Sequence, residues 1–166
     1  IGDYVFTVGE QSLPEMVGAL LKAKGKTMAT AESCTGGLIA KMMTDMPGSS
    51  EYFVGSVVAY ANAVKEELLN VPHDLLIEKG AVSHEVAEAM ACGVLRSTGA
   101  DYAISVTGVA GPGGATAEKP VGLVYVGFAD KQDRVSAEQL KLFGTRERIR
   151  ERSAMMALDI LRRKLV

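Results

Sequence analysis

The sequence has few of the residues that build disulfide frameworks or metal sites. Its 166 residues include two cysteines, Cys34 and Cys92, which form no C-x-x-C pair. Such sparse use of cysteine is typical of a cytoplasmic protein. The only histidines, His73 and His84, form no pair with a cysteine or with each other that has the spacing of metal ligands. We therefore expect a cytoplasmic protein that needs no metal and no other cofactor.

Long apolar segments and a surplus of positive charge are also absent. The longest stretch without a charge, Tyr102 to Ala117, is interrupted by glycines and a proline, so we expect no membrane span. Lysine plus arginine number 18 and aspartate plus glutamate number 20, a net charge of -2. Domains that bind duplex DNA usually carry a basic surplus, so we expect no nucleic acid partner. The remaining composition, 48% hydrophobic and 23% charged, is that of an ordinary globular domain.

Helical and strand patterns alternate along the chain. Helices are expected to begin near Ser12, whose spacing to Glu15 is that of a capping box, near Gly37, and after Asn62, Pro72, Ser83 and Thr145. Strands are expected at 27–33, 53–60, 102–106, 121–128 and 135–143, with 53–60 in the centre of the sheet and the last two joined as a hairpin. This order predicts an α/β protein, a three-layer α/β/α sandwich around a mixed, roughly five-stranded sheet ending in a β-hairpin.

Ligands of such sheets bind beyond the carboxyl ends of the strands. Three polar or glycine-rich segments follow expected strands, after Thr30, after Tyr60 and after Val106. We therefore expect these three segments to converge on one site.

The first of these segments is Ala31–Gly37, a turn from a strand into a helix. A hydroxyl at Ser33 would be exposed above the sheet, beside N–H groups of the helix start that can stabilise an oxyanion or bind a phosphate. The alternative is that Ser33 and Thr35 only cap the helix and that the glycines ease a tight turn. The residues alone leave both interpretations open.

The second segment carries Lys65. If Asn62 is the N-cap, Lys65 lies in the first helical turn, where the helix dipole disfavours an ammonium. Partial burial would lower its pKa further, toward that of a useful base. The alternative is a solvated surface lysine beside Glu66 and Glu67.

The third segment, Thr107–Gly114, is glycine-rich and lacks the residues of a P-loop or a dinucleotide fingerprint. This much glycine after a buried strand indicates close approach of the backbone to a ligand, and the alternative is a mobile surface loop. A fourth segment, Gly144–Arg150, opens the last helix with three arginines. Either this run is a solvated helical face or Arg146 is directed at a phosphate.

Five segments together carry a family resemblance. AESCTGG, VVAYANAVKEELLNVP, GAVSHEVAEAMACG, TGVAGPGG with EKPVGLVYVG, and the run 144–150 closely resemble the CinA C-terminal domain family, which includes stand-alone bacterial nicotinamide mononucleotide deamidases. The resemblance extends from about Leu13 to the end. Residues 1–11 resemble the stretch that joins this domain to an N-terminal domain. We expect residues 1–11 to be an N-terminal extension or interdomain linker and 12–166 to be a single domain.

The resemblance implies an amidase that converts nicotinamide mononucleotide to nicotinate mononucleotide and ammonia without a metal. It implies that Ser33 is the nucleophile, Lys65 the base and Tyr60 the hydroxyl that connects or positions them. The expected substrate-binding residues are Thr35, Gly36, Thr107, Gly108, Gly111, Gly113 and Arg146. Thr145 departs from the aspartate usual in the family, and 115–117 lack a further glycine and proline. We expect a small-molecule mononucleotide as ligand and a homo-oligomer of two or more copies.

The mechanism expected from these residues begins with Lys65 as the free amine. Lys65 would take the Ser33 proton directly or through Tyr60, and N–H groups at the start of the second helix would hold the oxyanion. Cys34 is a rival nucleophile, but its expected role is that of a small buried residue. An alternative function is a non-catalytic module that senses a nucleotide or binds a partner within a competence/damage-inducible CinA protein.

Overall fold

Five strands form one mixed sheet, and the computed structural model describes residues 11–166 of the chain. The strands are β1 (Met28–Glu32), β2 (Phe53–Val58), β3 (Tyr102–Gly108), β4 (Leu123–Asp130) and β5 (Val135–Lys141). Their order is β2-β1-β3-β4-β5, in which β1 is parallel to β2 and β3, while β4 and β5 are antiparallel additions. The predicted mixed sheet and the terminal hairpin are confirmed.

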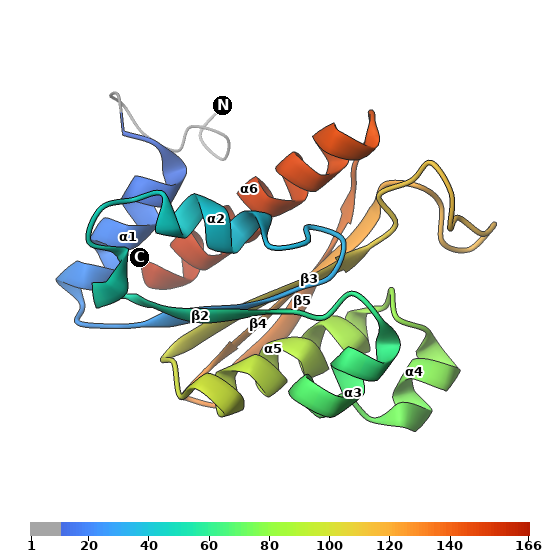
Figure 1. Cartoon of the computed structure of the whole chain (residues 1–166), viewed down its shortest axis with the longest axis horizontal. Helices are drawn as coiled ribbons and strands as arrows, with labels where there is room; N and C mark the ends of the chain where they lie inside the picture. The colour runs from blue at the N-terminus through green and yellow to red at the C-terminus, as the bar shows by residue number, and fades with distance from the viewer. Residues whose placement is uncertain (1–10) are drawn as a thin grey trace.

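Helices cover both faces of the described sheet (Figure 1). One layer holds α1 (Leu13–Ala23), α2 (Leu38–Thr44) and α6 (Arg146–Leu165), and the other holds α3 (Asn62–Leu69), α4 (His73–Lys79) and α5 (His84–Thr98). A separate cluster of buried apolar side chains lies under each layer. These two cores confirm the three-layer sandwich.

The position of β2 corrects an expectation. β2 is an edge strand of the described sheet, so the prediction that 53–60 lies in its centre is wrong. The helices cover β2 only partly, and Val54 and Val58 remain 48% and 47% exposed. An uncharged, β-branched sequence favours a strand but does not tell a central strand from an edge.

Most of the expected helix starts are confirmed. The Ser12 N–H donates to Glu15 Oε2 at 2.6 Å, and the hydroxyls of Ser83 and Thr145 accept N–H groups of the first turns of α5 and α6. Asn62 is an exception, because Ala61 is the N-cap of α3 and Asn62 is its first helical residue. Residues 1–10 lie outside the described part of the chain, so the extension expected there stays a prediction.

The strand register brings together the three segments that follow β1, β2 and β3, at the carboxyl ends of these parallel strands. Glu32, the last residue of β1, is paired with Val58 of β2 and with Val106 of β3. The residues that follow, Ser33 among them, therefore leave the sheet side by side. This confirms the expected convergence. Within residues 11–166, no helix is long and apolar enough to cross a membrane.

Candidate active site

A tight turn carries Ser33 from the end of β1 toward α2. The Ser33 N–H donates to the Val106 carbonyl at 2.9 Å, and the Gly36 N–H donates to the Ser33 carbonyl at 3.1 Å. Gly36 and Gly37 have φ of 60° and 91°, a left-handed conformation that favours glycine. The backbone on both sides of Ser33 is therefore fixed by hydrogen bonds.

The start of α2 is held by a carboxylate that sequence reasoning missed. Glu32 is fully buried, and its side chain accepts the N–H groups of Gly37, Ile39 and Ala40 at 3.0, 3.1 and 2.8 Å. Gly37, which has no side chain to cap with, is the N-cap, so the alternative that Ser33 or Thr35 caps this helix is wrong. An acidic residue just before a helix start was the available signal.

The same contacts correct the expected source of oxyanion stabilisation. The helix-start N–H groups of Gly37, Ile39 and Ala40 are bound to Glu32, and the Leu38 N–H faces the Thr35 carbonyl at 3.3 Å. These amides are therefore not free to bind a reaction intermediate.

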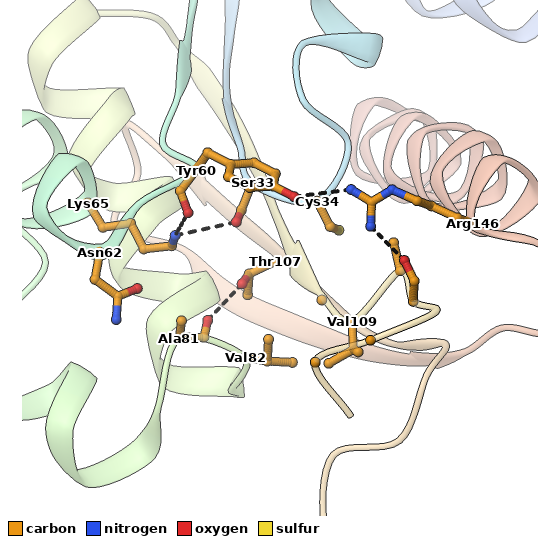
Figure 2. Close-up of a pocket in the computed structure, with 15 residues that line it drawn as sticks. Ser33, Cys34, Tyr60, Asn62, Lys65, Ala81, Val82, Thr107, Val109 and Arg146 are labelled. Carbon is orange, nitrogen blue, oxygen red and sulfur yellow. Dashed lines mark hydrogen bonds between the residues drawn. The ribbon is translucent and has the colours of Figure 1, made fainter. Parts of the chain in front are cut away.

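Lys65 lies under the turn with its ammonium group out of solvent. The residue is 1% exposed, and its Nζ is 3.3 Å from Ser33 Oγ, 2.7 Å from the Ala59 carbonyl oxygen and 3.2 Å from the Tyr60 carbonyl oxygen. Figure 2 shows Lys65 and Ser33 pointing toward one another. The alternative of a solvated surface lysine is wrong. Burial lowers the pKa of Lys65 from its ordinary value.

The three partners of Lys65 Nζ are oxygen atoms that accept hydrogen bonds from it. An uncharged amine has two N–H donors and one lone pair. The carbonyls of Ala59 and Tyr60 can only accept, so they take both donors. Nζ also donates to Ser33 Oγ; in the neutral amine, with both N–H groups on the two carbonyls, the lone pair is left to accept the Ser33 proton. This geometry equips Lys65 to remove the Ser33 proton.

The Tyr60 side chain lies away from this pair. Its hydroxyl accepts a hydrogen bond from Arg146 Nη2 at 3.1 Å, and the residue is 62% exposed. Only the main-chain carbonyl of Tyr60 contacts Lys65. In this structure the Tyr60 hydroxyl does not connect Ser33 with Lys65, contrary to the expected relay.

One cavity of about 260 Å³ joins these elements (Figure 2). The expected site residues that line it are Ser33, Tyr60, Lys65, Thr107, Gly108, Gly111, Gly113 and Arg146. Arg146 Nη1 donates to the Gly111 carbonyl at 2.7 Å, which ties α6 to the glycine-rich loop. Arg146 therefore faces the cavity, and the alternative of a purely solvated arginine is wrong. The loop approaches the site as the glycines indicate.

Two expected substrate-binding residues lie elsewhere. Thr35 is fully buried outside the cavity lining, and its carbonyl accepts a hydrogen bond from Arg150 Nη2 at 2.8 Å. Gly36 also lies outside the lining, against the same arginine side chain. Both residues shape the turn and neither lines the cavity, so a role of theirs in substrate binding stays a prediction. Their proximity to Ser33 in the sequence suggested contact with a ligand. In the structure both residues instead face the Arg150 side chain of α6.

Several lining residues were not named individually as catalytic or substrate-binding residues. They are Cys34, Asn62, Ala81, Val82, Val109, Ala110 and Gly114. Asn62 lies three residues before Lys65 in α3, a spacing that puts both on one helical face, and this was a usable signal. Ala81 and Val82 carried no signal in the sequence. Thr107 holds that segment, because its hydroxyl donates to the Ala81 carbonyl at 2.7 Å.

Cys34 lines the cavity next to Ser33 but is a poor nucleophile. Burial raises the pKa of its thiol to about 12, and the thiolate is the reactive form of cysteine. At neutral pH the thiol stays protonated. No group of three or more histidine, cysteine or acidic side chains that could hold a metal occurs in the described residues, 11–166.

Comparison with known sequences identifies relatives over the whole domain. A sequence model of the CinA C-terminal domain matches residues 10–165. A CinA-like protein of Desulfotalea psychrophila is 54% identical over an alignment that covers 100% of this chain and 40% of that protein. The chain spans about 40% of the length of the curated relatives it matches.

Two solved structures have the same fold. The competence/damage inducible protein CihA of Agrobacterium tumefaciens is 37% identical with a TM-score of 0.86, covering 93% of this chain and 96% of that chain. The competence damage-inducible protein A of Klebsiella pneumoniae is 31% identical with a TM-score of 0.89, covering 92% and 94%. The family match confirms the resemblance carried by the motifs, and these structures confirm the α/β fold.

Proposed function

Because the chain belongs to the CinA C-terminal domain family, we propose that it hydrolyses the carboxamide of nicotinamide mononucleotide to nicotinate mononucleotide and ammonia. The observation that carries this proposal is that Lys65 is buried with its Nζ 3.3 Å from Ser33 Oγ. A module that only bound a nucleotide would have no use for a buried lysine directed at a serine.

The first chemical step is acylation of Ser33. Neutral Lys65 takes the hydroxyl proton, and Ser33 Oγ attacks the carboxamide carbon to give a tetrahedral intermediate with a negative oxygen. The intermediate collapses when the C–N bond breaks. Lys65 returns its proton to the leaving nitrogen, which departs as ammonia and leaves an acyl-Ser33 ester.

We assign stabilisation of the developing oxyanion to the Cys34 N–H. The Ser33 carbonyl accepts the Gly36 N–H and so points into the turn. Since a trans peptide is planar, the Cys34 N–H of the same peptide points the opposite way, out of the turn. It donates to no other described residue, and Cys34 lines the cavity. An N–H directed at the position of the oxyanion lowers the barrier to the tetrahedral intermediate.

The second step is hydrolysis of the ester. Neutral Lys65 removes a proton from a water molecule, which attacks the acyl carbon, and the Ser33 oxygen leaves as it regains a proton from Lys65. The product is a carboxylate. One residue thus serves as base and then acid in both half-reactions.

Arg146 is suited to bind the phosphate of the substrate. Its guanidinium has five N–H donors, and its described bonds use one on Nη1 and one on Nη2, so three remain. Arg146 is also the first residue of α6, where the helix dipole favours an anion. Ser33 and Arg146 line the same cavity, so we assign the amide of the mononucleotide to the Ser33 side and its phosphate to Arg146.

The experiment is ammonia release from nicotinamide mononucleotide by the purified chain, with product identification by chromatography. We expect ammonia and nicotinate mononucleotide in equal amounts. Binding of the nucleotide by calorimetry without release of ammonia would instead identify a non-catalytic nucleotide-binding module.

A further inference from the structure

A second arginine of α6 contacts the turn that carries Ser33. Arg150 lies one helical turn after Arg146; its Nε donates to the Cys34 carbonyl at 3.1 Å and its Nη2 to the Thr35 carbonyl at 2.8 Å. Arg150 does not line the cavity. It therefore contacts the two residues that follow the nucleophile without facing a ligand.

The Arg150 contacts add two hydrogen bonds from α6 to the turn. Glu32 binds N–H groups at the start of α2, while Arg150 binds the two carbonyls just before that helix. The fit is close at Gly36, where a Cβ would lie 3.3 Å from Arg150 Nη2 and where φ is +60°. The turn is thus held by an anion from β1 and a cation from α6.

Arg150 is connected to the Cys34 N–H through two planar peptides and the hydrogen bond between them. Arg150 fixes the Thr35 carbonyl and with it the plane of the Thr35–Gly36 peptide, since that peptide is planar. The N–H of the same peptide belongs to Gly36 and donates to the Ser33 carbonyl at 3.1 Å. That bond in turn fixes the Ser33–Cys34 peptide, whose N–H faces out of the turn.

We propose that Arg150 is a positioning residue that orients the Cys34 N–H for oxyanion stabilisation. This role rests on the proposed amide hydrolysis. The positioning role explains why residue 150 is an arginine. A planar guanidinium can donate to two neighbouring carbonyls at once, whereas the ammonium of a lysine is a point charge on a shorter side chain. Arg150 acts on the transition state and not on substrate binding, so its loss lowers kcat and leaves KM nearly unchanged.

The test compares Arg150→Ala and Arg150→Lys with Arg148→Ala, which removes an exposed arginine of the same helix. We expect Arg150→Ala and Arg150→Lys to lower kcat by about tenfold to a hundredfold, below the loss of about 10² to 10³ for removing an oxyanion donor outright, with KM within about threefold. Millimolar methylguanidinium restores part of the activity of Arg150→Ala only. Arg148→Ala retains wild-type kinetics.

A second readout does not depend on the amide substrate. Fluorophosphonate probes phosphonylate an activated serine through an oxyanion-like transition state, so Ser33 should be labelled more slowly in Arg150→Ala than in wild type. A wild-type enzyme that is labelled but releases no ammonia would contradict the proposed substrate and still test Arg150.

Three results would overturn the role of Arg150. One is labelling of Arg150→Ala at the wild-type rate. Another is a loss of kcat that matches the loss of folded protein in thermal unfolding, without rescue by methylguanidinium. The third is a wild-type chain with neither labelling nor turnover. If Arg150→Ala does not fold, Arg150→Lys carries the kinetic and labelling tests.

Discussion

Lys65 Nζ and Ser33 Oγ lie 3.3 Å apart although 32 positions separate the two residues in the chain. The pairing depends first on the parallel register of β1 and β2, which places Ser33 and Ala59 side by side just beyond the carboxyl ends of these strands. It depends also on α3, which carries Lys65 back beneath them. In the described residues Lys65 has no carboxylate partner; its contacts are the serine and two carbonyls. Burial without a carboxylate partner lowers the pKa of Lys65 from its ordinary value.

The base function of Lys65 predicts the pH dependence of turnover. Burial lowers the pKa of Lys65, and only the neutral amine can accept the Ser33 proton. Below that pKa, kcat/KM should therefore rise with pH by about tenfold per unit, and above it the rate should level off. The pH–rate profile of the wild type should show a midpoint below the ordinary lysine value of about 10.4.

Lys65→Arg provides the matched variant for this base. Arginine keeps the positive charge but does not deprotonate, so we expect a loss of about 10² to 10⁴ in kcat, close to that of Lys65→Ala. Steady-state kinetics on both variants checks this, with circular dichroism as the control for folding. If Lys65→Arg were active, the lysine would serve only as a charge.

Tyr60→Phe separates a proton relay from a binding role. The Tyr60 hydroxyl contacts Arg146 and not the Ser33–Lys65 pair, so its removal should change kcat by less than about threefold and leave the pH–rate profile unchanged. KM should rise, because Arg146 loses a partner that orients it. A fall of kcat by orders of magnitude, together with a shifted pH profile, would restore the relay through this hydroxyl.

Arg146→Ala tests phosphate recognition. Loss of one charge-assisted contact costs about 1.5–3 kcal/mol, which corresponds to a rise in KM of about tenfold to a hundredfold for the mononucleotide. The unphosphorylated riboside should be a poor substrate of the wild type, and the variant should discriminate much less between the two. Arg148→Ala is the matched control. Equal losses toward nucleotide and riboside would argue that the phosphate binds elsewhere, along the glycine-rich loop.

Gly93→Ala tests the packing that supports Lys65. Alanine usually stabilises a helix by about 1 kcal/mol relative to glycine, but a Cβ at Gly93 of α5 would lie 2.1 Å from the Leu69 carbonyl oxygen of α3. We expect thermal unfolding to show destabilisation by about 1–3 kcal/mol, as for other overpacked sites. Gly55→Ala, whose Cβ meets nothing within 4 Å, is the control. Equal stability of the two variants would contradict the close approach of α3 to α5.

The fold was predictable where local patterns decide it. Ser83 and Thr145 cap their helices as their positions predict, because an N-cap interaction involves only the next three residues. The expected site residues around Ser33 and Lys65 follow from strand ends and family motifs. In contrast, the edge position of β2 depends on which strands pair, which its own sequence does not determine.

Most of the missed features depend on contacts between distant segments. Glu32 is the exception, because the N–H groups that it binds at the start of α2 lie five to eight residues away. Thr35 and Gly36, in contrast, face Arg150, which is more than a hundred residues away in the chain. The Tyr60 hydroxyl meets Arg146 for the same kind of reason. Local patterns identified these residues as part of the region, but only the tertiary structure determines which atoms they contact.

The most direct measurement of the central claim is ammonia release from nicotinamide mononucleotide by Ser33→Ala, beside Cys34→Ala. Loss of a covalent nucleophile costs several orders of magnitude in turnover, so we predict that Ser33→Ala is folded and inactive, with kcat reduced by about 10³ or more. Cys34→Ala should retain most of the activity, because the buried thiol stays protonated. A folded Ser33→Ala with a near-normal rate, or an inactive Cys34→Ala beside it, would contradict the account.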